Sequence, residues 1–328
     1  MPRFFCVVIV LTLLLIPAFG ETTLEKVSYK GWDNCVKLSN GDVELVITTD
    51  VGPRIMRYGF VDGQNMLGEL ESDLGKTGGD AWRLYGGHRL WHAPEGKPRT
   101  YWPDNQPVDH AWTDGVLRLS TPSEAGTGIQ KQLEITLDDT GPGVHIVHTL
   151  TNRNPWNVEM ACWALTVMAR NSRGIFPQEP YRSHTDYLLP ARPMVLWHYT
   201  DMSDPRWTWG KKYIQLQHDP NAQSPQKIGL MNSRGWAASA LNGEIFVKFY
   251  PYDKEATYPD FGVNTETFTN GGILEIETLG PLTRVAAGGG SISHRETWML
   301  FKTDVGTSEE SIDAAMAPAI EARDTFPR

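Results

Sequence analysis

Hydrophobic and polar residues alternate with a period of two along much of the chain, and the alternating runs end at turn-forming residues. One pair of runs flanks Asn40-Gly41, and a second pair flanks Asn242-Gly243. Asn-Gly between alternating runs is a strong signal for a tight β-hairpin. Strands are expected at 35–39, 42–48, 116–120, 129–137, 144–151, 158–168, 212–217, 236–241, 244–249, 273–278 and 292–301. The pattern therefore predicts a mostly β protein.

One convincing helix is expected, and it lies near the C-terminus. Residues 307–310 supply capping groups and acidic first-turn charge in front of residues 312–322. We expect this helix to pack against a sheet edge. No internal repeat, low-complexity tract or charged linker divides the chain after residue 20, so residues 21–328 are expected to form one two-sheet domain.

Composition excludes several classes of protein. The 328 residues include 31 Gly, 22 Pro and 12 Trp, and they lack the long uninterrupted helical stretches of a coiled coil or helical bundle. Lys and Arg together number 30 against 39 Asp and Glu, which gives a net charge of −9 at pH 7. Because an acidic protein has no general attraction to phosphate backbones, nucleic acid is not expected as a partner.

The first twenty residues have the features of a secretory signal peptide. Arg3 precedes an apolar run from Phe4 to Ile16, and Pro17 and a small-residue segment ending at Gly20 follow. The run is too short to span a bilayer and no later segment is long enough, so the mature chain is expected to have no membrane span. The pattern predicts a secreted or periplasmic protein, cleaved near Gly20.

Cysteine usage leaves one alternative open. Cys6 lies inside the apolar run and would leave with the signal peptide, so Cys35 and Cys162 remain. An oxidising compartment would permit a disulfide between them. Two cysteines in a chain of this size are more often buried as small hydrophobic residues.

The densest group of chemically capable residues lies between 73 and 114, where the strand signal weakens and long ordered loops are expected to cross one sheet face. Residues 82–95 and 101–105 combine aromatic rings with Arg, His and carboxylates. Rings stack on the C–H faces of sugars while polar groups bond hydroxyls, so this group suits carbohydrate recognition. Alternatively, the loop is rigid and its Trp residues fill the core beneath it. The binding candidates here are Arg89, Trp91 and His92.

Metal and nucleotide chemistry lack their usual motifs. His88 and His92 have the i,i+4 spacing of zinc ligands on a helix, but Gly86-Gly87 and Pro94 argue against a helix, and no third ligand has motif spacing. The chain also has no EF-hand loop, P-loop, dinucleotide fingerprint or Gly-x-Ser-x-Gly elbow. No metal site and no organic cofactor are therefore expected.

A pair of carboxylates lies on one strand-like run. Alternation places Leu274, Ile276 and Thr278 on one face and Glu275 and Glu277 on the other. If enclosed, two like charges about 7 Å apart along a strand raise one another's pKa, which favours general acid or base chemistry. If that face meets water, the pair is a solvated edge.

Other candidates depend on which way a side chain points. Lys248 alternates with apolar neighbours and could enter a cleft or lie on a solvated face. Glu266 follows the aromatic segment 258–261 and could bind a hydroxyl in the same opening. Lys211-Lys212 could recognise an acidic sugar or form an ordinary surface pair.

Several segments, taken in order, resemble one known superfamily. Residues 40–55 resemble the first strands of the galactose mutarotase superfamily, and Gly87-His-Arg-Leu90 resembles its Asn-Arg-Ile segment, whose Arg binds the sugar. Residues 274–281 and 294–298 resemble the region of the catalytic base Glu and the final strand. The resemblance, strongest to a divergent bacterial branch of uncharacterised domain proteins, covers most of residues 30–302. It implies an all-β, aldose 1-epimerase-like supersandwich of two large antiparallel sheets.

Carried over to this chain, the resemblance implies that Arg89 contacts substrate and that Glu277, with Glu275 as its rival, removes the anomeric hydroxyl proton. The chain departs from the superfamily in the central strand, where mutarotases hold their general-acid histidine. The matching stretch around Trp163 contains no histidine, and Trp163 itself would be a stacking platform or a core residue. His88 becomes the candidate acid by its position.

The expected function is binding of a carbohydrate between residues 82–112 and the strand carrying the two Glu. The expected reaction is epimerisation at the anomeric carbon, in which Glu277 takes the hydroxyl proton and His88 protonates the ring oxygen. One alternative is a polysaccharide lyase or glycoside hydrolase on the same fold, with Arg89 or Lys212 neutralising a uronate. The other is a non-catalytic carbohydrate-binding protein, which the missing histidine favours.

Overall fold

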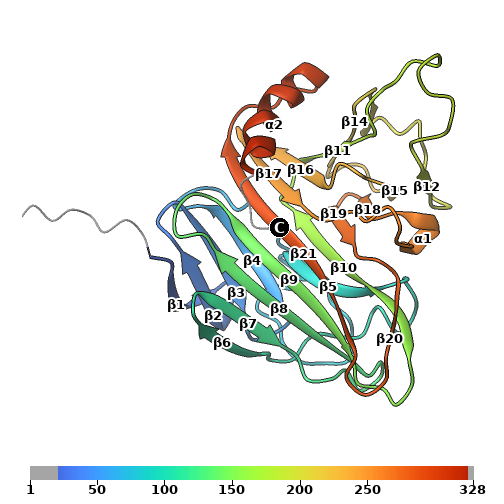
Figure 1. Cartoon of the computed structure of the whole chain (residues 1–328). Helices are drawn as coiled ribbons and strands as arrows, with labels where there is room; N and C mark the ends of the chain where they lie inside the picture. The colour runs from blue at the N-terminus through green and yellow to red at the C-terminus, as the bar shows by residue number, and fades with distance from the viewer. Residues whose placement is uncertain (1–20, 324–328) are drawn as a thin grey trace, which may run out of the picture.

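Two antiparallel sheets lie face to face in a computed structural model that describes residues 21–323 (Figure 1). The signal peptide expected at residues 1–20 lies outside the described residues. Across these residues the first sheet has eleven strands and the second has ten. The predicted fold class, an all-β supersandwich with a short C-terminal helix, is confirmed.

The first sheet carries the strands in the order β1 Thr23–Tyr29, β2 Trp32–Ser39, β3 Val43–Thr48, β4 Arg54–Phe60, β5 His88–Ala93, β10 Val158–Met168, β19 Leu274–Leu279, β18 Thr265–Thr269, β15 Gln226–Leu230 and β12 Met194–Leu196, with β20 Thr283–Val285 paired to β10. The second carries β13 Trp207–Trp209, β14 Tyr213–Gln217, β11 Arg173–Pro177, β16 Trp236–Leu241, β17 Glu244–Phe249, β21 Ser291–Lys302, β9 Val144–Asn152, β8 Ile129–Leu137, β7 Val116–Ser120 and β6 Asp109–Thr113.

The main core fills the space between the two sheets. Leu38 and Leu45 enter it from the first sheet, and Leu133 and Ile146 enter it from the second. Burying a side chain of this size contributes about 1.5–3 kcal/mol relative to exposure. The period-two pattern of strands such as β8, in which buried and half-buried positions alternate, is the sequence signature of this packing.

Both predicted hairpins are present. The turn at Asn40-Gly41 joins β2 to β3, and the turn at Asn242-Gly243 joins β16 to β17. Asn242 and Gly243 both have positive φ, 45° and 76°, as a type I′ turn requires.

The loop expected between 73 and 114 contains a central strand instead. Residues 88–93 form β5, which lies between β4 and β10, and all six residues are buried. A strand that is covered on both faces does not need polar residues at alternate positions, so its pattern carries no period of two.

Two helices lie within the described residues, α1 Pro259–Gly262 and α2 Glu309–Arg323. The predicted C-terminal helix is confirmed as α2, at the top of Figure 1. It does not pack against a sheet edge, because Ile312 and Met316 are buried in a cluster with Trp236, Val247 and Met299 on the outer face of the second sheet. No helix among residues 21–323 is long and apolar enough to cross a membrane.

The two cysteines are buried in separate places. Cys35 belongs to an apolar cluster with Trp32, and Cys162 belongs to the main core. Both are free thiols.

Candidate functional site

Alternation along β5 divides its side chains between the two faces of the first sheet. Leu90 lies in the core between the sheets, so Arg89 and Trp91 point to the outer face. On that face Trp91 packs in a separate cluster with Trp163 of β10. The outer face of the first sheet therefore carries two of the substrate-binding candidates and an aromatic cluster.

Strand register places four charged or apolar side chains in one row on this outer face. Arg89 is paired with Leu165 of β10, Leu165 with Glu277 of β19, and Glu277 with Glu266 of β18. Directly paired residues project from the same face of a sheet. Glu275, two residues before Glu277, shares this face as alternation predicts.

A pocket of about 230 Å³ opens above this row. Its aromatic side chains are Trp82, Trp91, Tyr101, Trp163, Tyr199 and Phe268. Its charged side chains are Arg89, Glu95, Lys227, Glu275 and Glu277. Aromatic walls with a few convergent polar groups are typical of a small-molecule site.

The ammonium group of Lys227 holds two carboxylates together at the floor of the pocket. Its Nζ lies 2.8 Å from Glu266 Oε2 and 3.2 Å from Glu277 Oε2. The same atom lies 4.8 Å from the ring centre of Trp163 and 4.7 Å from that of Trp197. Trp163 Nε1 also donates a hydrogen bond of 2.9 Å to Glu277 Oε2. The contacts fix one oxygen of Glu277 and leave the other free.

Burial perturbs the protonation of this group. It raises the pKa of Glu277, and it raises the pKa of Glu266 well above its ordinary value, although Lys227 opposes both shifts. Burial alone would lower the pKa of Lys227, but Glu266 and Glu277 outweigh it and hold that pKa well above the usual value. Lys227 is therefore charged, and two carboxyl groups compete to balance one cation.

Several buried polar atoms around the pocket have no hydrogen-bond partner among the described residues. They are Glu277 Oε1, Glu266 Oε1, Arg89 Nε and Trp82 Nε1. Buried polar atoms in folded proteins are nearly always paired, so such a concentration needs an explanation. A polar ligand in the pocket would supply the missing partners.

Comparison with solved structures decides the fold. No protein-family model matches the sequence, and no curated protein matches it. A galactose mutarotase-like protein from Lactobacillus casei matches with a TM-score of 0.54 and 12% identity, over 82% of this chain and 100% of that protein. The chain has the galactose mutarotase-like fold.

Two further solved structures are similar to this chain. A candidate aldose 1-epimerase from Klebsiella pneumoniae has a TM-score of 0.50 and 10% identity, over 92% of this chain and 87% of that protein. A TPR-domain containing protein from Parabacteroides distasonis has a TM-score of 0.53 and 14% identity, over 89% of this chain and 55% of that protein. Identities this low establish the fold and leave the chemistry to the site.

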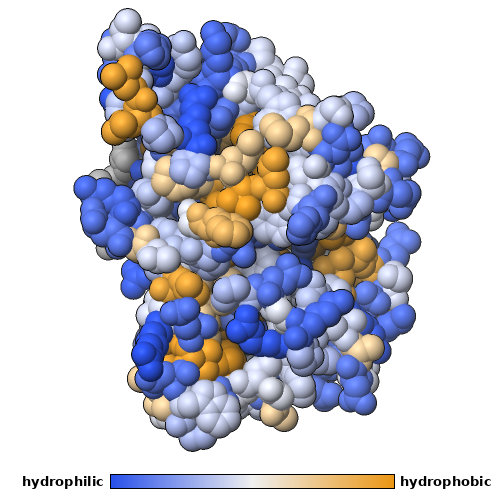
Figure 2. Space-filling view, turned by 90° about the vertical axis from the view of Figure 1, so that its right-hand side faces the viewer, coloured by the Kyte–Doolittle hydropathy of each residue, from blue (hydrophilic) through white to orange (hydrophobic). Residues whose placement is uncertain are grey.

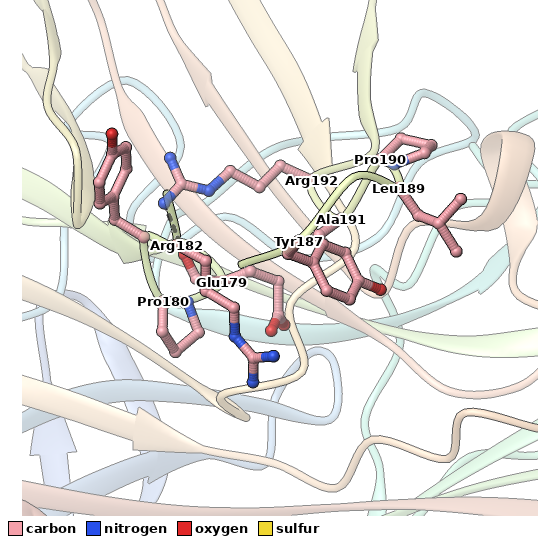
Figure 3. Close-up of a pocket in the computed structure, with 9 residues that line it drawn as sticks. Glu179, Pro180, Arg182, Tyr187, Leu189, Pro190, Ala191 and Arg192 are labelled. Carbon is pink, nitrogen blue, oxygen red and sulfur yellow. Dashed lines mark hydrogen bonds between the residues drawn. The ribbon is translucent and has the colours of Figure 1, made fainter. Parts of the chain in front are cut away.

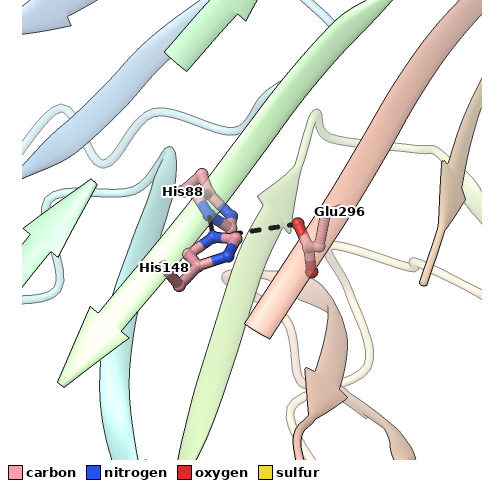
Figure 4. A group of neighbouring side chains, drawn as sticks. All are labelled: His88, His148 and Glu296. Atoms are coloured by element: carbon pink, nitrogen blue, oxygen red, sulfur yellow. Dashed lines mark hydrogen bonds and ion pairs between the residues drawn. The ribbon is translucent and has the colours of Figure 1, made fainter. Parts of the chain in front are cut away.

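Between the two sheets of this galactose mutarotase-like fold lies a second polar group, shown in part in Figure 4. His88 Nε2 lies 2.7 Å from His148 Nε2, and His88 Nδ1 lies 2.8 Å from Thr166 Oγ1. Lys248 Nζ donates to Thr166 Oγ1 at 2.7 Å and lies 3.0 Å from Glu296 Oε1. Burial lowers the pKa of both histidines, so they are neutral.

These donor atoms fit a hydrogen-bond network better than a cation. Single ligand atoms of His88, His148 and Glu296 lie within 4.8 Å of one another, close enough for a metal by proximity. However, His148 Nδ1–H donates a hydrogen bond of 3.1 Å to the carbonyl of His294, which leaves His148 Nε2 to accept a hydrogen bond from His88 Nε2–H. Lys248 already neutralises Glu296. A divalent cation would have to displace these bonds beside an ammonium group.

The structure does not bring His88, His92 or Lys248 to the pocket, where the sequence analysis placed them. His88 and His92 share the inward face of β5 with Leu90, and Lys248 belongs to β17 of the second sheet. All three are buried between the sheets. His88 therefore cannot reach a sugar in the pocket, and a general acid on the outer face has to be another residue.

Sequence reasoning missed Lys227, Tyr199 and Phe268. The signal for Lys227 is a lysine inside the run Gln-Lys-Ile-Gly-Leu, whose apolar and small residues mark a covered strand. Lys212, which the sequence suggested as a ligand for an acidic sugar, is half exposed and forms an ion pair with Asp313 of α2, away from the pocket.

A larger hollow, of about 460 Å³, lies in the loop between β11 and β12 (Figure 3). Among the described residues that line it, Glu179 is the one carboxylate, and it accepts a hydrogen bond from Ser233. Arg192 donates to the Glu179 carbonyl at 2.7 Å. Because no second carboxylate, no histidine and no lysine lines this hollow among the described residues, we place the chemistry in the smaller pocket on the sheet.

Proposed function

We propose that this protein binds a carbohydrate in the pocket on the first sheet and epimerises it at the anomeric carbon. The observation that carries the proposal is the pair of buried carboxyl groups on Lys227 beneath aromatic walls, with Glu277 Oε1 unpartnered. Acid/base chemistry needs two groups in different protonation states, and a shared cation between two carboxyls favours that condition.

The walls of the pocket support sugar binding. The ring centres of Trp91 and Trp163 lie 5.4 Å apart at 72°, and those of Trp91 and Tyr101 lie 5.1 Å apart at 63°. Inclined rings offer both faces and edges to the C–H groups of a pyranose. Arg89 is held 4.4 Å above the ring of Trp91 and 2.9 Å from Glu275, and its unpartnered Nε can bond a hydroxyl.

In the proposed reaction Glu277 acts as the base. Its free Oε1 accepts the proton of the anomeric hydroxyl, the bond from the anomeric carbon to the ring oxygen breaks, and an aldehyde forms. The ring oxygen takes a proton from Lys227 Nζ, which lines the pocket, while Glu266, whose pKa burial raises, passes its own proton to Lys227, so that the lysine stays charged and Glu266 is the net acid. Rotation about the bond to the next carbon and reversal of the transfers close the opposite anomer.

A second candidate is a carbohydrate-binding protein without chemistry. One observation favours it: among the described residues no histidine lines the pocket that contains Trp163, and His88 faces the core. A lyase would need a cation to neutralise the uronate. Lys212 lies beside α2 and cannot fill this role in the pocket, and the charge of Arg89 is already balanced by Glu275.

A panel of sugars tests the proposal and separates these alternatives. Wild-type protein is mixed with pure anomers of common aldoses and with polysaccharides. Exchange NMR follows anomer interconversion, a reducing-end assay follows hydrolysis, and absorbance of unsaturated uronates follows lysis. Accelerated interconversion supports the proposal. Binding without any of the three reactions supports the second candidate.

The secreted location remains a proposal based on residues 1–20. If it holds, N-terminal sequencing of the exported protein starts near Glu21. Mature protein that still begins at Met1 would contradict it.

A further inference from the structure

A second hollow lies beside the proposed sugar pocket. It has a volume of about 370 Å³ and is lined by Val195, Leu196, Trp197, His198, Asp260 and Phe261. These residues come from the edge strand β12, the turn after it, and α1. Figure 2 shows the face that carries β12 and α1, where hydrophobic residues form separate patches among polar ones.

The two hollows share a wall. Trp197 lines the second hollow, and its ring centre lies 4.7 Å from Nζ of Lys227, which lines the first. Tyr199, two residues later, lines the first pocket and packs 6.5 Å from Phe268. The charge of Asp260 also acts on Glu266, the partner of Lys227. A ligand seated over Lys227 can therefore continue past Trp197 into the second hollow.

Phe261 is presented to solvent in an unusual way. Its side chain is 95% exposed, and its backbone has φ of +64° directly after Asp260 at +48°. Two consecutive residues other than glycine in the left-handed region are unfavourable, and for a bulky side chain positive φ is a genuine outlier. The chain holds an aromatic ring in water at the rim of a hollow, where it can serve as a stacking surface.

We propose that the ligand is an oligosaccharide, and that the sugar linked to the one in the first pocket stacks on Phe261 in the second hollow. The proposal rests on the function proposed above. Asp260 and His198 supply an acceptor and a donor for its hydroxyls. An exposed ring beside a carboxylate and an imidazole suits a sugar, whose C–H face stacks on the ring while its hydroxyls bond the polar groups.

Binding as a function of chain length tests the proposal. The probes are glucose, galactose, mannose and xylose, each beside its linear oligomers of two to four units, and tryptophan fluorescence of the full chain reports binding. We expect the preferred series to bind about ten-fold more tightly as a dimer than as a monomer. Phe261→Ala should remove that gain and leave the monomer affinity unchanged, while Phe261→Tyr should keep it. Trp156→Ala, a change at another exposed aromatic ring, which is 62% exposed and does not line either hollow, is the control.

The outcomes distinguish the two proposals. Monomers that bind as tightly as their oligomers would overturn the second subsite and leave the proposed function standing. Equal weakening of monomer and oligomer by Phe261→Ala would also overturn it. If no sugar of any length binds, the proposed function fails and the subsite fails with it.

Discussion

Lys227 sets the charge balance of the pocket. It is the cation within reach of both Glu266 and Glu277, and both carboxyls are buried. Losing one partner of a buried ionic group leaves the remaining charge uncompensated. The protonation of the proposed base therefore depends on a residue that sequence reasoning did not select.

Replacing Lys227 with Met should shift the pH dependence of activity. Lys227 lowers the pKa of Glu277, so its removal raises that pKa, and the base ionises only at higher pH. We expect the acid limb of the kcat profile to move up by about 1–3 pH units. Lys227→Arg should restore the position of the limb because it restores the positive charge, but kcat should stay low because arginine does not release a proton. An unchanged limb in Lys227→Met would remove Lys227 from the proton path.

His88→Gln tests the assignment made from sequence. Because His88 bonds Thr166 and His148 between the sheets, its replacement should lower the free energy of unfolding by about 1–3 kcal/mol. Anomer exchange by the folded variant should stay within two-fold of wild type. Urea unfolding and exchange NMR on the same sample provide both values. A large loss of exchange at unchanged stability would return the acid role to His88.

The candidate site was partly predictable at the level of residues. Alternation placed Glu275 and Glu277 on one face because their neighbours Leu274 and Ile276 are plainly apolar. Along β5 alternation does not show which residues face the core, since Leu90 and Trp91 are adjacent and both apolar, and either could point inward. Only the packing of Leu90 against the second sheet sends His88 inward.

Elements differ in how much their sequence reveals. Strands with one half-exposed face, such as β8 and β9, were predicted nearly to the residue. Strands β5, β11 and β15 are buried at every position and were not predicted, because a strand covered on both faces does not need to alternate and their sequences show no period of two. The site combines β10 and β19, which were predicted, with β5 and β15, which were not, and this explains why its geometry needed the structure.

The helix α2 should contribute stability independently of the pocket. Ile312 is fully buried against the outer face of the second sheet, so Ile312→Ala should cost about 2–5 kcal/mol. Glu321→Ala, on the exposed side of the same helix, should change stability by less than about 0.5 kcal/mol. Urea denaturation measures both. Equal effects would mean that the helix does not dock as described.

For the whole molecule, the histidines buried between the sheets predict acid sensitivity. Burial lowers the pKa of His294 to about 3 and that of His92 to about 3, against about 6.5 in the unfolded chain. Between these two pKa values the unfolded state binds more protons than the folded state. The contribution of each neutral histidine to the free energy of unfolding is therefore fully present above pH 6.5 and is lost as the pH falls towards 3. Each histidine contributes about 1.4 kcal/mol per pH unit to this loss.

His294→Gln should make the slope of unfolding free energy against pH shallower by about 1.4 kcal/mol per unit between pH 4 and 6. His184→Gln, at an exposed position, should leave the slope unchanged. Urea titrations at several pH values measure it. A slope that stays the same in His294→Gln would show that His294 is already protonated in the native state.

For the molecule as a whole, the fold does not determine the function. The galactose mutarotase-like fold supplies a large sheet, the outer face of that sheet carries a pocket in this chain, and the residues of the pocket determine what it does. In this chain they are two carboxyls on one lysine, and no histidine lines the pocket among the described residues.

The most direct test compares Glu277→Gln with Glu275→Gln, two changes on the same strand and face. Anomer exchange and sugar affinity are measured on each variant with the best sugar of the panel. Glu277→Gln should lower kcat by about 10²–10⁴-fold with Kd nearly unchanged, because it removes the base and keeps the shape. Glu275→Gln should chiefly weaken binding through Arg89. Wild-type exchange in Glu277→Gln would contradict the proposed mechanism.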